Sequence, residues 1–198
     1  MIEQCVAEGI GCVAITDHNE FKAFADEKDN PEGIIIIPAE EVSSSESHIV
    51  ALGIDRQIPR DMGIQETIDA IHEAGGFAVA AHPYRWGSGL GVKNTLAFDF
   101  DGIEALNARS IPSANRKSLK LAHKIGKPMT AGSDAHSPGK IGHGYVDLPD
   151  GLKTWQEVME AIKAGKAEPH SSSRAMGGTL RYGVKSIGQW IFRGFKRM

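Results

Sequence analysis

Six short, β-rich runs that end in polar residues alternate with helical stretches along most of this 198-residue chain. The alternation extends from about residue 11 to residue 165 and is typical of βα units, which build a mostly parallel sheet or barrel. The runs are Cys12–Thr16, Ile34–Ile37, His48–Leu52, Phe77–Ala81, Gly102–Leu106 and Met129–Ala131. The sequence therefore predicts an α/β fold in which polar side chains gather where strands end.

Helices with well-marked ends are predicted between these runs, at Gln65–Ala74, Ser113–Ile125 and Thr154–Ala164. Glycine follows each of them, and Pro112 precedes the second. Met1–Glu8 has the pattern of the last turns of an amphipathic helix, with Ile2, Cys5 and Val6 on one face. A crossover helix implies an earlier strand, so we expect a barrel that lacks about one strand on this side.

The C-terminal part differs in charge from the rest of the chain. After His170 there are six basic residues and no acidic residue, which leaves 16 basic against 25 acidic residues before it. Val184, Ile187, Ile191 and Phe195 follow a helical spacing there. We therefore predict a main domain over residues 1–168 and a basic tail with an amphipathic helix over 169–198. The partner of the tail stays open among an anionic membrane, nucleic acid and the protein's own acidic body.

Cysteine content and hydropathy indicate the setting. Cys5 and Cys12 lack CxxC spacing, and the start of the chain lacks the pattern of a signal peptide, so we expect a reducing cytoplasm. The longest apolar run is Ile34–Pro38, far below the roughly 20 residues that a membrane span needs.

Histidines lie in four of the polar segments, three of which also contain a carboxylate. These segments are Asp17-His18, Glu41 with His48, Ala81-His82-Pro83, which closes a strand, and Asp134-Ala135-His136. Imidazole and carboxylate together suit Zn²⁺, Mn²⁺ or iron, and no cysteine lies near enough in sequence to suggest a thiolate site. If the last strand continues through Asp134 and His136, both side chains point to the same side. The pattern indicates a hydrolytic metal centre at the mouth of a barrel.

Five segments, in order, resemble the PHP (polymerase and histidinol phosphatase) family. They are AITDHN, PAEEVSS followed by HIVALG, AHP, IEALN and GSDAH, and the resemblance covers about Met1 to Leu148. The resemblance implies a distorted barrel of seven βα units whose mouth holds one to three divalent metal ions. It also implies phosphoester hydrolysis.

Carried over by position, the resemblance implies metal ligands at His18, Glu41, His48, His82, Asp134 and His136, with Asp17 beside them. Glu41 is favoured over Glu40 because the family's proline-glycine-x-glutamate segment aligns with Pro38–Glu41. The family's opening His-x-His motif and the Asp after it would precede Met1, so we expect fewer metal ions, ligands borrowed from elsewhere, or a misplaced start of the sequence.

Arg85, Asn107, Arg109 and Lys140 each follow a proposed ligand or strand end by a few residues. Their side chains could hold a phosphate, or could be ordinary solvated loop residues. We expect a metal-dependent phosphoesterase that acts on a small phosphorylated substrate or a short oligonucleotide. The alternatives are a catalytically weakened binding module and an amidohydrolase-like hydrolase. The edge left by the absent strand could pair with a second copy of the chain.

Overall fold

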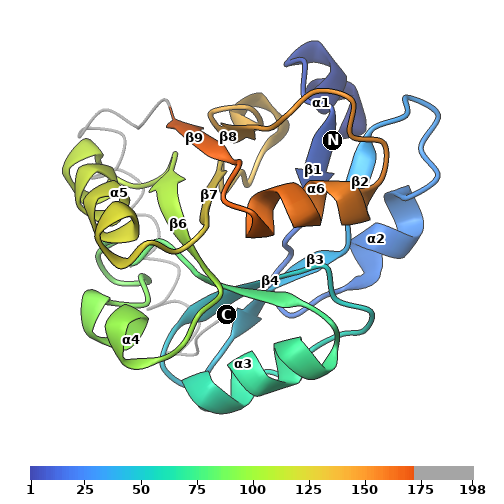
Figure 1. Ribbon diagram of the computed structural model, residues 1–198. Helices are drawn as coiled ribbons and strands as arrows, with labels where there is room; N and C mark the ends of the chain where they lie inside the picture. The colour runs from blue at the N-terminus through green and yellow to red at the C-terminus, as the bar shows by residue number, and fades with distance from the viewer. Residues whose placement is uncertain (172–198) are drawn as a thin grey trace, which may run out of the picture.

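The computed structural model describes residues 1–171 (Figure 1). In chain order its elements are α1 (Ile2–Ala7), β1 (Cys12–Ala14), α2 (Lys22–Glu27), β2 (Ile35–Ile37), β3 (Ala39–Ser43), β4 (His48–Leu52), α3 (Ile64–Glu73), β5 (Phe77–Ala80), α4 (Val92–Ala97), β6 (Gly102–Asn107), α5 (Pro112–Ile125), β7 (Met129–Gly132), the short 3₁₀ helix η1 (Pro138–Lys140), β8 (Gly144–Asp147), α6 (Trp155–Lys163) and β9 (Glu168–Ser171). Across this range no helix has the length and apolar character to span a bilayer.

A five-stranded sheet in the order β3-β4-β5-β6-β7 forms the centre of the fold. β5, β6 and β7 are parallel, as the alternating pattern predicts. β4 is antiparallel to both of its neighbours. The turn between β3 and β4 explains this, because Ser44 donates its backbone N–H to the Ser47 carbonyl, and so short a connection can only reverse the chain.

Two further pairs of strands flank this sheet: the parallel pair β1-β2 and the antiparallel pair β8-β9. An isolated bridge between His18 and Glu41 links the end of the β1 segment to β3. β8 and β9 lie beside β7. Within residues 1–171 the hydrogen-bonded strands form three separate sheets and no closed ring. The mixed α/β expectation is confirmed, but a closed barrel and a mostly parallel arrangement around it are not observed.

Apolar residues pack on the sheet from two sides. Helix α3 buries Ile64, Ile68 and Ile71 against a cluster that includes Ile49 and Ile103 from the strands. Helix α6 buries Val158, Met159 and Ile162 in a second cluster with strand residues of β2, β4 and β5. Figure 1 shows α3, α4 and α5 on the outside of the sheet and α6 next to β2. This packing fixes the strand ends that carry the polar side chains.

The predicted helices are confirmed to within a residue at either end, but several elements were not predicted. β3 follows β2 after the single residue Pro38, and its sequence Ala-Glu-Glu-Val-Ser has little β character although all five residues are buried. α2, α4, β8 and β9 were also not predicted. Val6, placed on the buried face of α1, is 49% exposed, whereas Ile2 and Cys5 are buried as expected. β9 crosses the predicted boundary at residue 168, and the amphipathic helix predicted for the tail lies outside the described residues.

Candidate metal centre

Strand ends bring the candidate side chains to one edge of the sheet. His82 directly follows Ala81 after β5, Asn107 ends β6, and Asp134 lies two residues beyond β7. Because β4 runs the opposite way, its first residue, His48, lies at this same edge, paired with Ser43 at the end of β3. Segments far apart in the sequence therefore meet here, as expected for a fold with several parallel strands.

The loop that carries His18 is fixed to β3 by three hydrogen bonds of Asn19. The Asn19 backbone N–H donates to the Glu41 carbonyl (3.0 Å), its Nδ2 donates to Ser43 Oγ (3.0 Å), and its Oδ1 accepts from the Ser43 N–H (2.8 Å). Asn19 has a φ of +55°, a conformation that Asn adopts more readily than most residues. This small polar residue thus places the His18 imidazole over the Glu41 carboxylate.

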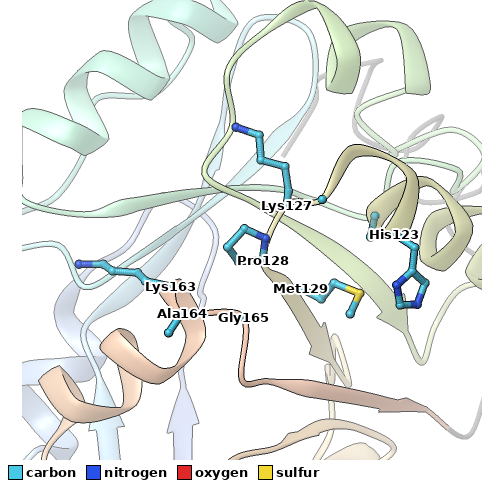
Figure 2. Close-up of a pocket in the computed structure, with 9 residues that line it drawn as sticks. His123, Lys127, Pro128, Met129, Lys163, Ala164 and Gly165 are labelled. Carbon is cyan, nitrogen blue, oxygen red and sulfur yellow. The ribbon is translucent and has the colours of Figure 1, made fainter.

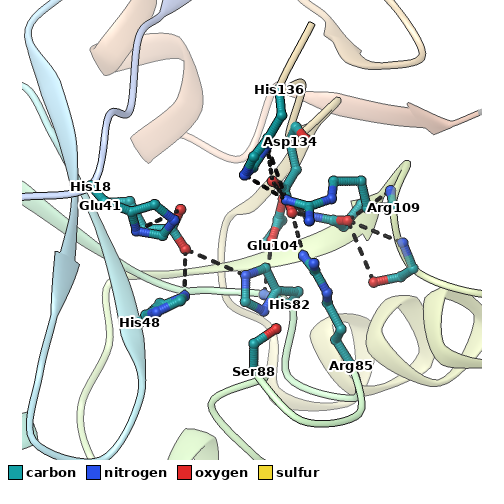
Figure 3. A network of polar contacts seen from close by, with 12 residues as sticks. His18, Glu41, His48, His82, Arg85, Ser88, Glu104, Arg109, Asp134 and His136 are labelled. Carbon is teal, nitrogen blue, oxygen red and sulfur yellow. Dashed lines mark hydrogen bonds and ion pairs between the residues drawn. The ribbon is translucent and has the colours of Figure 1, made fainter. Parts of the chain in front are cut away.

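Glu41 is the centre of the histidine cluster (Figure 3). Its Oε1 lies 2.9 Å from His48 Nδ1 and 3.5 Å from His82 Nε2, and its Oε2 lies 3.7 Å from His18 Nδ1. One ligand atom from each of His18, Glu41 and His48 lies within 4.8 Å of the others. Three imidazoles around one carboxylate offer nitrogen and oxygen ligands of the kind that first-row transition metals bind.

Burial and charge act on these groups in opposite directions. Burial alone would raise the pKa of Glu41, but hydrogen bonds and charge from His48 and His82 outweigh it and hold the pKa well below its usual range. Burial lowers the pKa of His18, which Glu41 only partly offsets. Glu41 is therefore ionised and His18 favours its neutral form, which are the states in which each residue binds a metal.

Two imidazole nitrogens in the cluster are buried without a hydrogen-bond partner. They are His18 Nδ1 and His82 Nδ1. Buried polar atoms in folded proteins normally have a partner, since an unmet hydrogen-bonding group costs about 1–3 kcal/mol. The unpaired His18 nitrogen lies 3.7 Å from the ionised Glu41 carboxylate, an arrangement that a bound cation would complete.

Glu104 accepts hydrogen bonds from two residues at this edge of the sheet. Its Oε2 accepts the His82 backbone N–H (2.8 Å), and its Oε1 accepts from Asn107 Nδ2 (3.0 Å). His82 has a φ of +28°, an unfavourable value for a non-glycine residue, so this hydrogen bond helps to hold a strained turn. Burial raises the pKa of Glu104 to about 7, and Asn107 and His82 only partly offset that rise.

Asp134 lies between two arginines, across from the histidine cluster (Figure 3). The edge of the sheet that carries the histidine cluster and Asp134 is called the mouth. Arg85 Nη1 bonds Oδ2, Arg109 Nη1 lies 2.5 Å from Oδ1, and Asn107 Nδ2 also donates to Oδ2 (3.3 Å). Burial alone would raise the pKa of Asp134, but the charges of Arg85 and Arg109 lower it. All three side chains are mostly buried, so the ion pairs are shielded from solvent.

The expectation that an extended strand aligns Asp134 and His136 is wrong. β7 ends at Gly132, and Asp134 has a φ of +48°, which breaks the extended conformation. The two side chains still lie close together, since His136 Nδ1 is 3.6 Å from Asp134 Oδ1. Arg109 Nη1 lies 3.1 Å from both His136 ring nitrogens. The His136 ring centroid is 6.5 Å from that of His18, so His136 faces the same mouth.

The structure thus brings all six proposed metal ligands around one mouth but separates them into two groups. His18, Glu41, His48 and His82 form the histidine cluster, and Asp134 and His136 lie with the arginines. Asp17 and Lys140, the other candidates, are exposed. Asp17 contributes its carbonyl, which accepts the Glu41 N–H (3.2 Å). No side-chain hydrogen bond or ion pair ties either residue to the mouth in the part of the chain that the structure describes.

The choice of Glu41 over Glu40 agrees with the geometry. Glu40 is fully buried on the opposite face of β3, where its Oε1 accepts the Ile58 N–H (2.7 Å). Sequence reasoning missed Glu104, although it lies within the quoted IEALN segment. A β-bulge between Glu104 and Leu106 turns Glu104 and Asn107 toward each other, whereas strict alternation would place them on opposite faces. No periodicity in the sequence marks that bulge.

A separate hollow lies where α5 and α6 end and β7 begins (Figure 2). Its lining includes His123, Lys127 and Lys163. Lys127 already pairs with Asp99 (2.6 Å), and Lys163 pairs with Glu160 (3.2 Å). The C-terminal ends of helices also disfavour anions. This hollow therefore offers no evident ligand chemistry.

Comparisons with known proteins give the context of this site. Residues 112–167, which include Asp134 and His136, match the family described as PHP-associated. Two uncharacterized proteins of Methanocaldococcus jannaschii are similar in sequence. MJ1587 is 34% identical over 103 residues, which are 51% of this chain, and MJ0417 is 27% identical over 159 residues, which are 74% of it. The chain spans only about three fifths of the length of these curated relatives, 60% and 61%.

Solved structures share the fold at low identity. A two-domain protein from Bacteroides vulgatus containing a predicted PHP-like metal-dependent phosphoesterase gives a TM-score of 0.65 at 15% identity, covering 86% of this chain and 58% of that one. An amidohydrolase from Chromobacterium violaceum with bound sulfate gives 0.65 at 21%, covering 81% and 89%. Endonuclease Q in complex with a duplex that has an abasic lesion gives 0.57 at 16%, covering 82% and 50%. The resemblance to the PHP family that the sequence predicts is confirmed.

Proposed function

We propose that this chain, which has a PHP-associated segment and the fold of PHP-like phosphoesterases, is a metal-dependent phosphoesterase. In this proposal a phosphate ester is hydrolysed by water at the mouth formed by the strand ends. The observation that supports it most is the grouping of His18, Glu41 and His48, whose ligand atoms lie within 4.8 Å of one another.

The residues of this mouth fit a divalent ion. His18, Glu41 and His48 would hold it, and His82, 3.5 Å from Glu41, would be a further ligand or the start of a second site. Zn²⁺, Mn²⁺ and iron all suit this donor set. When bound, such an ion supplies Lewis acidity, which makes a water molecule nucleophilic near neutral pH and offsets phosphoryl charge. We propose one to three ions, with the first at His18, Glu41 and His48.

Arg85 and Arg109 would orient the phosphate in this proposal. Their guanidinium groups come from the loops that follow β5 and β6, and both pair with Asp134. Guanidinium groups bind phosphate oxygens in a fixed planar geometry, which suits positioning of an ester for attack. In this proposal the phosphate of the substrate would replace Asp134 as the acceptor for Arg85 and Arg109. Asn107 donates to both Glu104 and Asp134 and so holds these two carboxyl groups in fixed positions relative to each other.

The substrate in this proposal is a small phosphorylated molecule or the end of a short oligonucleotide. A mouth with two arginines and several imidazoles favours a dianionic phosphate over a neutral amide or ester. Among the comparisons, endonuclease Q binds duplex DNA and the C. violaceum protein is described as an amidohydrolase, so both alternatives define test substrates. A second copy of the chain that pairs along the open edge of β1 belongs to the same proposal, as does a cytoplasmic setting.

The test is hydrolysis of an aryl phosphate by protein loaded separately with Zn²⁺, Mn²⁺ or Fe²⁺. We expect turnover with at least one ion, competitive inhibition by inorganic phosphate, no turnover of the matching aryl amide, and loss of activity with chelator. His48→Ala should abolish turnover and lower metal content. His123→Ala, which changes an exposed histidine on α5, is the matched control and should change neither.

Three results would contradict the proposal. Turnover that survives both chelator and His48→Ala would remove the metal from the reaction. Amide hydrolysis without phosphate hydrolysis would favour the amidohydrolase alternative. A folded protein that binds metal but hydrolyses none of these substrates would favour a binding module.

A further inference from the structure

Trp86 is the most exposed large hydrophobic residue of residues 1–171, with 87% of its surface accessible. An indole ring has a large apolar surface, and leaving it in water forgoes the stabilisation that its burial would bring. Exposed tryptophans are accordingly common where a protein binds something with an apolar face. The position of Trp86 in the fold indicates which kind of ligand it would contact.

The loop that carries Trp86 has a fixed conformation. It connects β5 to α4, and its ends, His82 and Leu90, are buried. The Arg85 N–H donates to the His82 carbonyl (2.9 Å), and the Gly89 N–H donates to the Arg85 carbonyl (3.1 Å). Gly89 lies so close to these carbonyls that a Cβ there would be 2.5 Å from one and 2.6 Å from the other. The backbone at Trp86 is therefore held by a compact turn in which residue 89 has to be glycine.

This turn borders the mouth on both sides of Trp86. Arg85, the residue before it, extends its mostly buried guanidinium to Asp134 (Figure 3). Ser88, two residues after it, accepts a hydrogen bond at its carbonyl from Ser47 Oγ (3.3 Å), in the turn just before His48. Consecutive Cα atoms are about 3.8 Å apart, so the backbone of Trp86 lies at the rim of the mouth, next to the arginine that faces it.

We propose that Trp86 is a stacking surface for a planar ring on the alcohol side of the phosphate ester. This inference rests on the proposed function and names the class of substrate: a phosphate ester whose leaving alcohol carries an aromatic or heteroaromatic ring. Arg85 takes the phosphate, and the indole one residue away takes the ring. Stacking on a tryptophan tolerates every base, because each has a flat π face, so Trp86 selects for a ring and not for its identity.

The test compares three phosphate esters that differ in the ring: a nucleoside monophosphate, phenyl phosphate and glycerol phosphate. The readout is the ratio of the KM for glycerol phosphate to the KM for each ring-bearing ester. Loss of a base stacked on an aromatic side chain weakens binding about 5- to 150-fold, so Trp86→Ala should reduce that ratio by a factor in this range. Trp86→Phe should restore most of it. Leu96→Ala, which removes another exposed apolar side chain on α4, is the control and should leave the ratio unchanged.

A second readout does not depend on turnover. Stacking quenches indole fluorescence, so titrating the metal-loaded wild type with a nucleoside monophosphate should quench its emission. The quench should disappear in Trp86→Phe, which retains Trp155 and Trp190. If the wild type hydrolyses no ester but shows this quench, the proposed function fails and the ring site stands.

The inference is overturned if Trp86→Ala leaves the KM ratio unchanged and Trp86→Phe retains the quench. It is also overturned if Trp86→Ala converts a dimer to a monomer without changing the ratio, since Trp86 would then contact a second copy. The ring-bearing esters separate the two sources of the ring: a change confined to the nucleotide identifies a nucleobase, and a change for both identifies aromatic esters in general.

Discussion

Replacing Glu104 with Gln should remove a specific pH dependence of stability. The pKa of Glu104 rises from 4.5 in the unfolded chain to about 7 in the fold, mainly because the carboxyl is buried. Between those values unfolding releases a proton, so the stabilising contribution of the protonated group is fully present below pH 4.5 and is lost as the pH rises toward 7. This linkage amounts to about 2.5 kcal/mol between pH 5 and pH 8.

The assay is urea unfolding of the metal-free wild type and Glu104→Gln at pH 5, 6, 7 and 8. Gln cannot ionise, and it can accept only one of the two hydrogen bonds that Glu104 accepts from His82 and Asn107. The variant is therefore destabilised by an amount that does not depend on pH. Subtracting the two unfolding free energies cancels most of the titration of other groups. The wild type should lose about 2.5 kcal/mol relative to the variant from pH 5 to pH 8. A difference that stays flat, or that favours the wild type as pH rises, would refute the assignment of a buried Glu104 with a raised pKa.

Three further predictions concern the mouth. Glu41→Gln should weaken Zn²⁺ or Mn²⁺ binding at least 100-fold in calorimetry, since loss of an outer-shell partner alone costs about 10–100-fold; equal affinity would place the ion elsewhere. A divalent ion at 100 times its Kd should raise the unfolding free energy by about 2.7 kcal/mol, seen as a higher thermal midpoint, and the rise should be absent in His48→Ala. Arg109→Gln should raise the inhibition constant of inorganic phosphate at least several-fold, and an unchanged constant would remove Arg109 from phosphate binding.

Local patterns in the sequence predicted most of the regular elements. Helix ends marked by Pro112, Gly126 and Gly165 are within a residue of their observed positions, because capping preferences act over a few neighbouring residues. The direction of β4 was not predictable from hydrophobic pattern, because it depends on a tight serine turn whose residues also suit a longer loop. β3 was missed because its burial comes from the surrounding sheet and not from its own composition.

The candidate site likewise contains residues that local sequence identifies and contacts that only the fold creates. The histidines and Glu41 could be identified because their residue types and order carry the pattern, and the structure brings them to one mouth. The pairing of Asp134 with Arg85 and Arg109 could not be predicted, since it joins three strand ends through a positive-φ turn. The exposure of Trp86 likewise depends on what the fold leaves uncovered, which the sequence of its loop does not encode.

The most direct measurement of the central claim is the anomalous scattering of a divalent ion in crystals of the protein grown with Mn²⁺ or Zn²⁺. We predict a peak within coordination distance, roughly 2.0–2.2 Å, of nitrogen atoms of His18 and His48 and an oxygen of Glu41. A peak at another part of the molecule, or none at this cluster when the crystals contain the ion elsewhere, would contradict the account.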